Sequence, residues 1–161
     1  MREFVLVRHA HRHVIDPMGD NGLSEKGRLQ SLKVKDYLMK HFVSKSLKDR
    51  KPLLLHSSPR LRCRYTLEPF AEEIGRPVEI NNLLDEAARQ RMPMDQRIKK
   101  FIRWLTRDTH ENVIACSHGD WIPEFFRHVL DREESLKKSG LCRFEVHGDQ
   151  LKAVETVQEW D

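Results

Sequence analysis

The chain has 161 residues, a length that fits one domain with a substantial core and is short for two. Hydrophobic residues make up 39% and charged residues 34%, a balance typical of a soluble globular protein and unlike that of a membrane or disordered chain. The net charge is +4, but Lys and Arg are interleaved with Asp and Glu, and no basic block is paired with stacking aromatic residues. Nucleic acid is therefore not an expected partner.

Strand-like and helical segments alternate along the chain. In chain order the sequence predicts strand Glu3–Val7, helix Ser24–His41 capped by Ser24, strand Pro52–His56, helix Arg62–Ile74 closed by Gly75, strand Pro77–Ile80, helix Met94–Thr106, strand Asn112–Cys116, helix Trp121–Leu130, and strands Leu141–His147 and Gln150–Val157. In the first helix Leu29, Leu32, Leu38 and Phe42 recur at helical spacing.

This alternation predicts an α/β fold, a three-layer sandwich with a mainly parallel central sheet and helices on both faces. Several strands are continuously apolar, which favours burial on both sides. The last two strands turn at Gly148 and Asp149, so an antiparallel hairpin is expected at one edge.

No apolar run approaches the roughly 18 residues that a membrane helix needs, and the run FVLV is too short for the core of a signal peptide. We therefore expect a cytoplasmic location and no membrane partner. Cys63, Cys116 and Cys142 are odd in number and outside any Cys-x-x-Cys pattern, which predicts small reduced core residues rather than a disulfide framework or a structural zinc site.

Arginine and histidine residues stand where two of the predicted strands end. Arg8 and His9 come directly after the first strand, and His118 and Gly119 come after the fourth. Arg62 begins the helix that follows the second strand. In open α/β sheets ligands bind beyond the carboxyl ends of the strands, so these side chains are expected to converge. Two arginines and two histidines suit a tetrahedral dianion, which indicates phosphoryl chemistry.

Five segments match the motifs of one known family. They are LVRHA at Leu6–Ala10, LSEKGRLQS at Leu23–Ser31, SSPRLRC at Ser57–Cys63, LDE at Leu84–Glu86 and CSHG at Cys116–Gly119. In this order, and over nearly the whole chain, they resemble the histidine phosphatase (phosphoglycerate mutase-like) superfamily, and by size its short phosphohistidine phosphatases. The chain departs from the family pattern at Ala10, where glycine is commoner, and at Ala87–Met92, which lacks the glycines often found there. The resemblance implies one histidine phosphatase domain over residues 1–161.

The resemblance also implies a role for each motif residue. His9 is the expected nucleophile, forming a phosphohistidine that water then cleaves, while a backbone carbonyl keeps its other ring nitrogen protonated. Arg8, Arg62 and His118 are expected to bind the phosphoryl oxygens. Glu86 is the expected general acid and then general base, a role that needs a pKa raised by burial.

Two of these assignments have neighbouring rivals. Asp85 competes with Glu86 for the acid–base role, because it is one residue away. Arg60 and Arg64 compete with Arg62, which is favoured because the family places this arginine four residues after the serine or threonine at the second strand, here Ser58.

The activity implied is that of a phosphatase acting on phosphomonoesters or phosphohistidine, without a cofactor or a metal ion. The substrate is a phosphorylated small molecule or a phosphoprotein, and the oligomeric state is left open. Only Ala87–Pro93 separates Glu86 from the next helix, which predicts an open pocket. An open pocket favours hydrolysis over mutase chemistry, since a mutase must exclude water with a closing lid.

Three alternatives accompany this interpretation. The first is a phosphoglycerate mutase-type phosphotransferase. The second is a metal-dependent hydrolase that uses His9 and His11 as ligands, although such barrels need about 200 residues or more. The third is a noncatalytic binding module, which is disfavoured because every motif residue is present.

Overall fold

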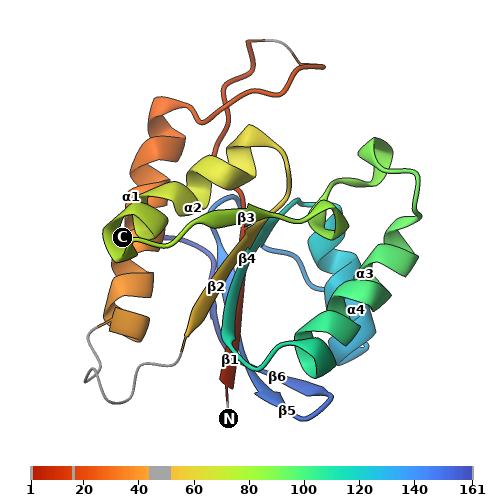
Figure 1. The fold of residues 1–161 in the computed structure, drawn as a ribbon. Helices are drawn as coiled ribbons and strands as arrows, with labels where there is room; N and C mark the ends of the chain where they lie inside the picture. Colours follow the sequence, from red (N-terminus) through yellow and green to blue (C-terminus); the bar gives the residue numbers. More distant parts are fainter. Residues whose placement is uncertain (1, 16, 44–51, 161) are drawn as a thin grey trace.

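The computed structural model describes residues 2–15, 17–43 and 52–160, and six strands in these ranges form one mixed sheet (Figure 1). The strands are β1 (Arg2–Arg8), β2 (Leu53–Ser57), β3 (Val78–Ile80), β4 (Asn112–Ser117), β5 (Leu141–His147) and β6 (Gln150–Val157). Their order across the sheet is β3-β2-β4-β1-β5-β6. The pairs among β1 to β4 are parallel, whereas β5 pairs antiparallel with β1 and with β6.

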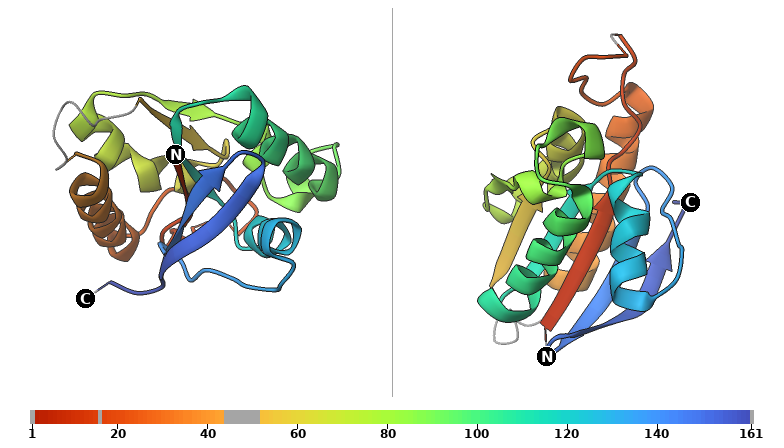
Figure 2. Two further views of the ribbon diagram at one scale, coloured as in Figure 1. Left: turned by 90° about the horizontal axis from the view of Figure 1, so that it is seen from below. Right: turned by 90° about the vertical axis from the view of Figure 1, so that its right-hand side faces the viewer.

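Helices cover both faces of the sheet. They are α1 (Glu25–Leu38), α2 (Leu61–Ile74), α3 (Met94–Arg103) and α4 (Trp121–Leu130). Both views of Figure 2 show α1 and α2 on one side of the sheet and α3 and α4 on the other. The predicted three-layer α/β sandwich with an antiparallel edge is therefore confirmed.

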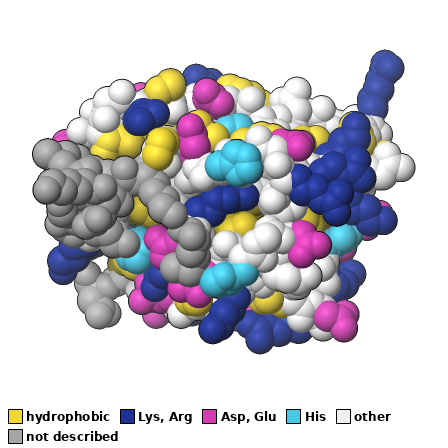
Figure 3. Space-filling model, turned by 60° about the horizontal axis from the view of Figure 1, so that its bottom comes forward, with side chains coloured by type: hydrophobic (Ala, Val, Ile, Leu, Met, Phe, Trp, Pro, Cys, Tyr) yellow, Lys and Arg dark blue, Asp and Glu magenta, His cyan; other side chains and the backbone are white. Residues whose placement is uncertain are grey.

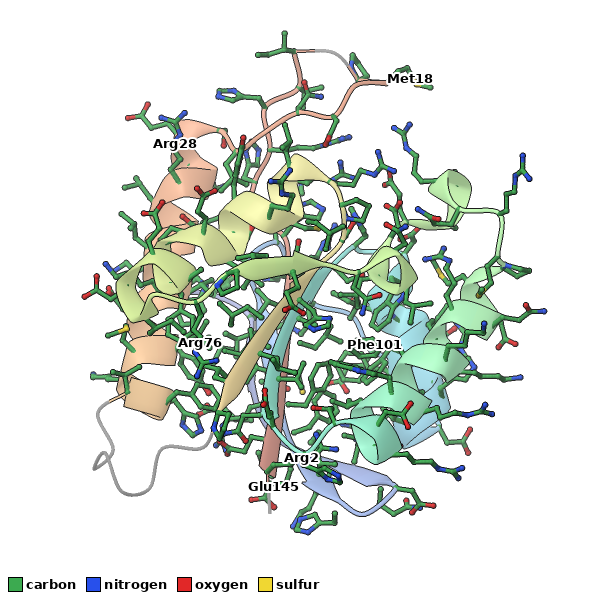
Figure 4. All side chains as sticks on the ribbon, viewed as in Figure 1. Arg2, Met18, Arg28, Arg76, Phe101 and Glu145 are labelled. Carbon is green, nitrogen blue, oxygen red and sulfur yellow. The ribbon has the colours of Figure 1, made fainter. Side chains whose placement is uncertain are left out.

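Two hydrophobic clusters fill the space between the layers. One contains Phe4 and Leu6 of β1 with Phe101 of α3 and Phe125 of α4, and the other contains Val5 and Val7 of β1 with Val34 of α1 and Leu67 of α2. Successive residues of a strand point to opposite faces, so the unbroken run Phe4–Val7 serves both clusters. Phe101, labelled in Figure 4, reaches from α3 towards the sheet, where its ring centroid lies 5.7 Å from that of Phe4.

The exposed leucines of α1 were not expected from their helical spacing. Leu29 and Leu32 are 62% and 45% exposed. The buried residues of the helix are Gly27, Ser31, Val34 and Leu38. A Cβ atom at Gly27 would lie 1.9 Å from the backbone oxygen of His11, so this close approach needs a glycine. Gly27 allows the helix to lie against the segment after β1, so that Val34 and Leu38 are buried while Leu29 and Leu32 are left outside.

Two predicted helices end earlier than expected, because each continues as a wider turn. Met39–Val43 after α1 and Trp104–Asp108 after α3 are π-helical, with hydrogen bonds to the fifth residue rather than the fourth. The predicted caps are confirmed. Ser24 accepts a hydrogen bond from the backbone nitrogen of Gly27, and Gly75 ends α2 at φ 68°.

Figure 3 shows the end away from the carboxyl ends of the parallel strands, where Lys and Arg gather at one edge and elsewhere alternate with Asp and Glu. Cys63, Cys116 and Cys142 are buried with free thiols, as expected. None of the described helices is both long and apolar enough to cross a bilayer.

Candidate active site

The site residues predicted from the sequence surround one hollow at the carboxyl ends of the parallel strands. The hollow has a volume of about 520 Å³ and is lined by Arg8, His9, Arg12, Arg62, Glu86, His118, Gly119, Asp120 and Lys138. The parallel pairing of β1 with β4 sets Arg8 opposite Ser117, so the residues that follow both strands emerge side by side. The backbone nitrogen of His9 donates to the oxygen of Ser117, and the ring centroids of His9 and His118 are 5.5 Å apart.

The imidazole of His9 is held as one neutral tautomer. Its Nδ1 lies 2.9 Å from the backbone oxygen of Ala10, and because a carbonyl can only accept, Nδ1 carries the proton. The pKa of His9 is lowered to about 3, first by burial and also by the positive charges of Arg62 and Arg8, against the effect of the Ala10 hydrogen bond. Nε2 makes no hydrogen bond with the described residues and is left as the basic nitrogen on the ring.

His118 is oriented from behind by a hydroxyl group. Its Nε2 lies 2.7 Å from Oγ of Ser58, and this hydroxyl lies 3.4 Å from a carboxylate oxygen of Asp85. Nδ1 of His118 faces the hollow, where Nη2 of Arg62 lies 3.2 Å away. Because an arginine can only donate, this Nδ1 is the acceptor in the unliganded site and the proton resides on Nε2, towards Ser58.

Arg8 and Arg62 both keep hydrogen-bonding capacity for an anion. Arg62 is 4% exposed and donates from Nη2 to Oε2 of Glu86 at 2.7 Å. Arg8 donates from Nη1 to the backbone oxygen of Leu136 at 2.8 Å. The Nε atoms of both arginines are buried without a partner in the described part of the chain. A buried donor without a hydrogen bond costs free energy, and such donors are typical of a site that binds a ligand.

The absence of a side chain at Gly119 leaves space for the guanidinium of Arg8. A Cβ atom at Gly119 would lie 2.7 Å from Nη2 of Arg8 and 2.8 Å from its Cζ. The glycine is therefore needed for the close approach of an arginine side chain, in addition to any approach of the ligand to the backbone.

Glu86 lines the hollow as predicted, but the expected upward shift of its pKa is wrong for the unliganded protein. Burial raises the pKa of this carboxyl, yet the hydrogen bond from Arg89 and the charge of Arg62 outweigh it and the pKa is lowered. The carboxylate accepts from Nη2 of Arg62 at 2.7 Å and from Nε of Arg89 at 3.0 Å. Glu86 is therefore ionised while the hollow holds no anion.

Asp85 does not line the hollow, whereas Glu86 does. The structure thus distinguishes the two carboxylates between which the sequence left the acid–base role open. Asp85 is fully buried, and its carboxylate accepts hydrogen bonds from Nε and Nη2 of Arg60 at 3.1 and 2.9 Å. Gln90 and the backbone nitrogen of Glu86 each donate to it at 2.9 Å. Although burial raises the pKa of Asp85, these hydrogen bonds and the Arg60 charge lower it to about 2. Arg60 is thus held in an ion pair beside the site.

Arg97 is a residue of the site that the sequence analysis missed. It is 1% exposed and donates to backbone oxygens on both sides of Glu86. Nη1 lies 2.5 Å from the oxygen of Asp85, Nη2 lies 3.3 Å from that of Glu86, and Nε lies 3.0 Å from that of Met92. These bonds hold the backbone that carries Glu86. The signal in the sequence is a single arginine next to Ile98 on the apolar face of the predicted helix.

His11 is engaged in the fold rather than directed at His9. Its Nδ1 lies 2.6 Å from Oγ of Ser24, and its backbone nitrogen donates to Oε1 of Gln30 at 2.8 Å. Among residues 2–15, 17–43 and 52–160, no three His, Cys, Asp or Glu side chains gather as potential metal ligands. The alternative based on His9 and His11 therefore finds no third ligand in the described part of the chain.

Comparisons with known proteins show the family and the fold of the chain. A family model described as the histidine phosphatase superfamily (branch 1) matches residues 4–94. No curated protein matches the chain in sequence. Among solved structures, the protein histidine phosphatase SixA in complex with tungstate is similar with a TM-score of 0.74 at 14% identity, covering 97% of this chain and 96% of that one.

Two further structures have the same fold. A phosphoserine phosphatase mutant from Entamoeba histolytica in complex with phosphoserine has a TM-score of 0.72 at 15% identity, with 97% of this chain and 96% of that chain covered. A mycobacterial glucosyl-3-phosphoglycerate phosphatase in complex with VO3 has a TM-score of 0.72 at 17% identity, with 100% and 99% covered. At these identities the likeness is one of fold.

Proposed function

The chain belongs to the histidine phosphatase superfamily, and from this premise we propose that it hydrolyses phosphomonoesters or phosphohistidine through a covalent phosphohistidine at His9. The family confirms the expected class of enzyme, a phosphatase. The observation that carries the proposed mechanism is the hydrogen bond from Nδ1 of His9 to the Ala10 oxygen, at 2.9 Å, on a ring that burial keeps neutral. A neutral imidazole with one fixed N–H has its lone pair on the other nitrogen, as a nucleophile requires.

In the first step Nε2 of His9 attacks phosphorus while the bond from phosphorus to the leaving oxygen breaks. Arg8, Arg62 and His118 bind the nonbridging oxygens and stabilise the charge that shifts onto them in the transition state. His118 can serve as a donor here when its Nδ1 carries a proton, and Ser58, with the buried Asp85 carboxylate beyond it, holds the ring at Nε2. Glu86 donates a proton to the leaving oxygen.

The lowered pKa of Glu86 in the unliganded site does not oppose this role. The shift depends on Arg62 and Arg89, which donate to the carboxylate. A phosphoryl dianion in the hollow attracts the Arg62 guanidinium and adds negative charge beside the carboxylate. Both effects raise the pKa of Glu86, so binding of the substrate favours the protonated form that a general acid needs.

In the second step water attacks the phosphohistidine, and the bond between Nε2 and phosphorus breaks. The Glu86 carboxylate left by the first step accepts the proton of this water. The ring of His9 returns to the neutral form with its proton on Nδ1, and inorganic phosphate leaves. No group besides water and the substrate is consumed.

We also propose that the enzyme releases phosphate rather than moving it within a substrate. A short turn, Ala87–Arg89, follows Glu86, and α3 begins at Met94, so little chain is present there to cover the hollow. Exclusion of water from the phosphorylated intermediate would require such a cover. The loop between β1 and α1 also lies at this end of the molecule, and Met18 is near its tip (Figure 4). A cytoplasmic setting for this activity remains a prediction from the sequence.

Rapid acid-free quenching of the enzyme with a phosphorus-labelled substrate tests the covalent step. The wild type should accumulate a protein adduct that is labile in acid and stable in base, as a phosphohistidine is. His9→Ala should form no adduct, and its turnover should fall by several orders of magnitude, to near background. His13→Ala is the matched control, because His13 is exposed and lies outside the hollow. An adduct that persists in His9→Ala would contradict the proposal.

A further inference from the structure

A second hollow adjoins the phosphate site on the side of α1. Its volume is about 650 Å³, and it shares Arg8 and Lys138 with the first hollow as a common wall. Lys26 and Leu29 of α1 line it together with Trp160. A substrate bound by its phosphoryl group at His9 would therefore meet this second hollow with the remainder of its structure.

Cationic side chains gather where the two hollows meet. Arg12, Lys26 and Lys138 have no carboxylate within ion-pair distance in the described part of the chain, and Lys26 and Lys138 are exposed. In contrast, Lys137 on the same segment pairs with Glu159. The pKa of Lys138 is lowered, first by partial burial and then by the positive charges of Arg8, Arg12 and Lys26. These groups therefore lie close enough to repel one another.

Neither Glu86 nor Asp120, the two carboxylates that line the first hollow, forms an ion pair with Arg12, Lys26 or Lys138 in the described part of the chain. Glu86 is bound to Arg62 and Arg89, and Asp120 accepts from the backbone nitrogen of Ala87 at 2.9 Å. A single phosphoryl group is already supplied with donors by the residues around His9. The cations at the junction exceed what that group needs, and a further negative charge bound there would relieve their mutual repulsion.

We propose that Arg12, Lys26 and Lys138 form a subsite for a second anionic group of the substrate, a carboxylate or a second phosphate near the scissile phosphoryl group. This inference rests on the proposed function and specifies its substrate class: phosphate compounds with a second anionic group are preferred over those with a neutral remainder. A carboxylate on a small metabolite and an acidic side chain of a phosphoprotein have the same chemistry at this subsite.

Binding of phosphonates tests the subsite independently of turnover, since the carbon–phosphorus bond is not cleaved by this chemistry. We compare 3-phosphonopropionate with propylphosphonate by calorimetric titration at low salt. The carboxylate should tighten binding to the wild type by about 10-fold, as expected for an anion that meets two or three partly exposed cations. The double variant Lys26→Ala/Lys138→Ala should lose most of this preference, and 150 mM NaCl should reduce it.

Lys152→Ala is the control, because Lys152 is an exposed lysine of β6 outside both hollows. It should keep the full preference for the carboxylate. Equal binding of the two phosphonates by the wild type, or a preference that survives in the double variant, would overturn the inference. Failure of the proposed function has a different signature, the absence of a covalent adduct and of phosphate release, whatever the phosphonates do.

A pair of phosphoserine peptides, with Glu or with Gln on both sides, identifies the source of the second anion. Leu29 is 62% exposed in the second hollow, where an extended peptide would contact it. Preference for the Glu peptide, with weaker binding in Leu29→Ser, would support a protein substrate. Discrimination between the phosphonates alone would support a small metabolite. Both results presuppose a preference for 3-phosphonopropionate over propylphosphonate and support the subsite, whereas equal binding of the two phosphonates overturns it.

Discussion

Replacement of Gly119 by alanine should lower catalysis while leaving the fold intact. The new Cβ atom would lie 2.7 Å from Nη2 of Arg8, and ordinary van der Waals contact begins at 3.4 Å. The guanidinium must therefore move by about 0.7 Å, since carbon and nitrogen atoms repel steeply below their contact distance. Its position beside the phosphoryl oxygens is then lost in part.

The magnitude follows from the role of a preorganised donor. Removal of one transition-state donor typically costs about 100- to 1000-fold in kcat. A donor displaced by less than 1 Å keeps part of its effect, so we expect Gly119→Ala to lower kcat by about 10- to 100-fold, or roughly 1.4 to 2.7 kcal/mol. The unfolding free energy should change by less than about 1 kcal/mol, because Gly119 does not have a positive φ and the clash is with a flexible side chain.

Steady-state phosphate release and urea denaturation measure the two quantities separately. Gly75→Ala is the matched control. Gly75 has φ 68° at the end of α2 and has no atom within 4 Å of its Cβ position, so alanine should cost about 1 kcal/mol of stability and leave kcat unchanged. In an Arg8→Ala background Gly119→Ala should have almost no further effect on kcat, because the group that it displaces is gone. Full activity of a folded Gly119→Ala protein would refute the role given to Arg8.

Four further outcomes are expected. Glu86→Gln should slow alkyl phosphates far more than p-nitrophenyl phosphate, whose leaving group needs little protonation, and equal slowing in a comparison of the two substrates would remove the general-acid role. Arg97→Met should show the same dependence on the leaving group, with about a 10-fold loss for alkyl phosphates, since the carbonyls that it holds position Glu86; a loss of stability alone would make Arg97 purely structural. Asp85→Asn should lower the unfolding free energy by about 2 kcal/mol at pH 7, because the folded-state pKa of Asp85, about 2, lies below its usual 3.8. This contribution is present above pH 4 and is lost as the pH falls towards 2, so pH titration of both proteins should bring their stabilities together. Turnover should be unchanged by exhaustive dialysis against EDTA, and restoration by zinc of a lost activity would favour a metal-dependent mechanism.

The sequence by itself determined the features that depend on local chemistry. Apolar runs long enough for strands, the cap at Ser24 and the left-handed turn at Gly75 specify their elements from neighbouring residues alone. Their alternation selects the layered sheet, and the rule that parallel strands end at one edge brings Arg8, His9 and His118 together. These predictions need no knowledge of contacts between distant segments.

The tertiary structure decided what depends on partners far along the chain. Asp85 and Glu86 are neighbours in sequence, yet Arg60 holds one inside and Arg62 meets the other at the hollow. Hydropathy could not show the exposure of Leu29, because the contact made by Gly27 is with the backbone of a different segment. The downward pKa shift of Glu86 also depends on a distant segment, since Arg62 of α2 donates to its carboxylate. Periodicity reports how a residue relates to its own helix or strand, whereas burial, charge pairing and pKa are set by whichever groups the packed chain brings within a few ångströms.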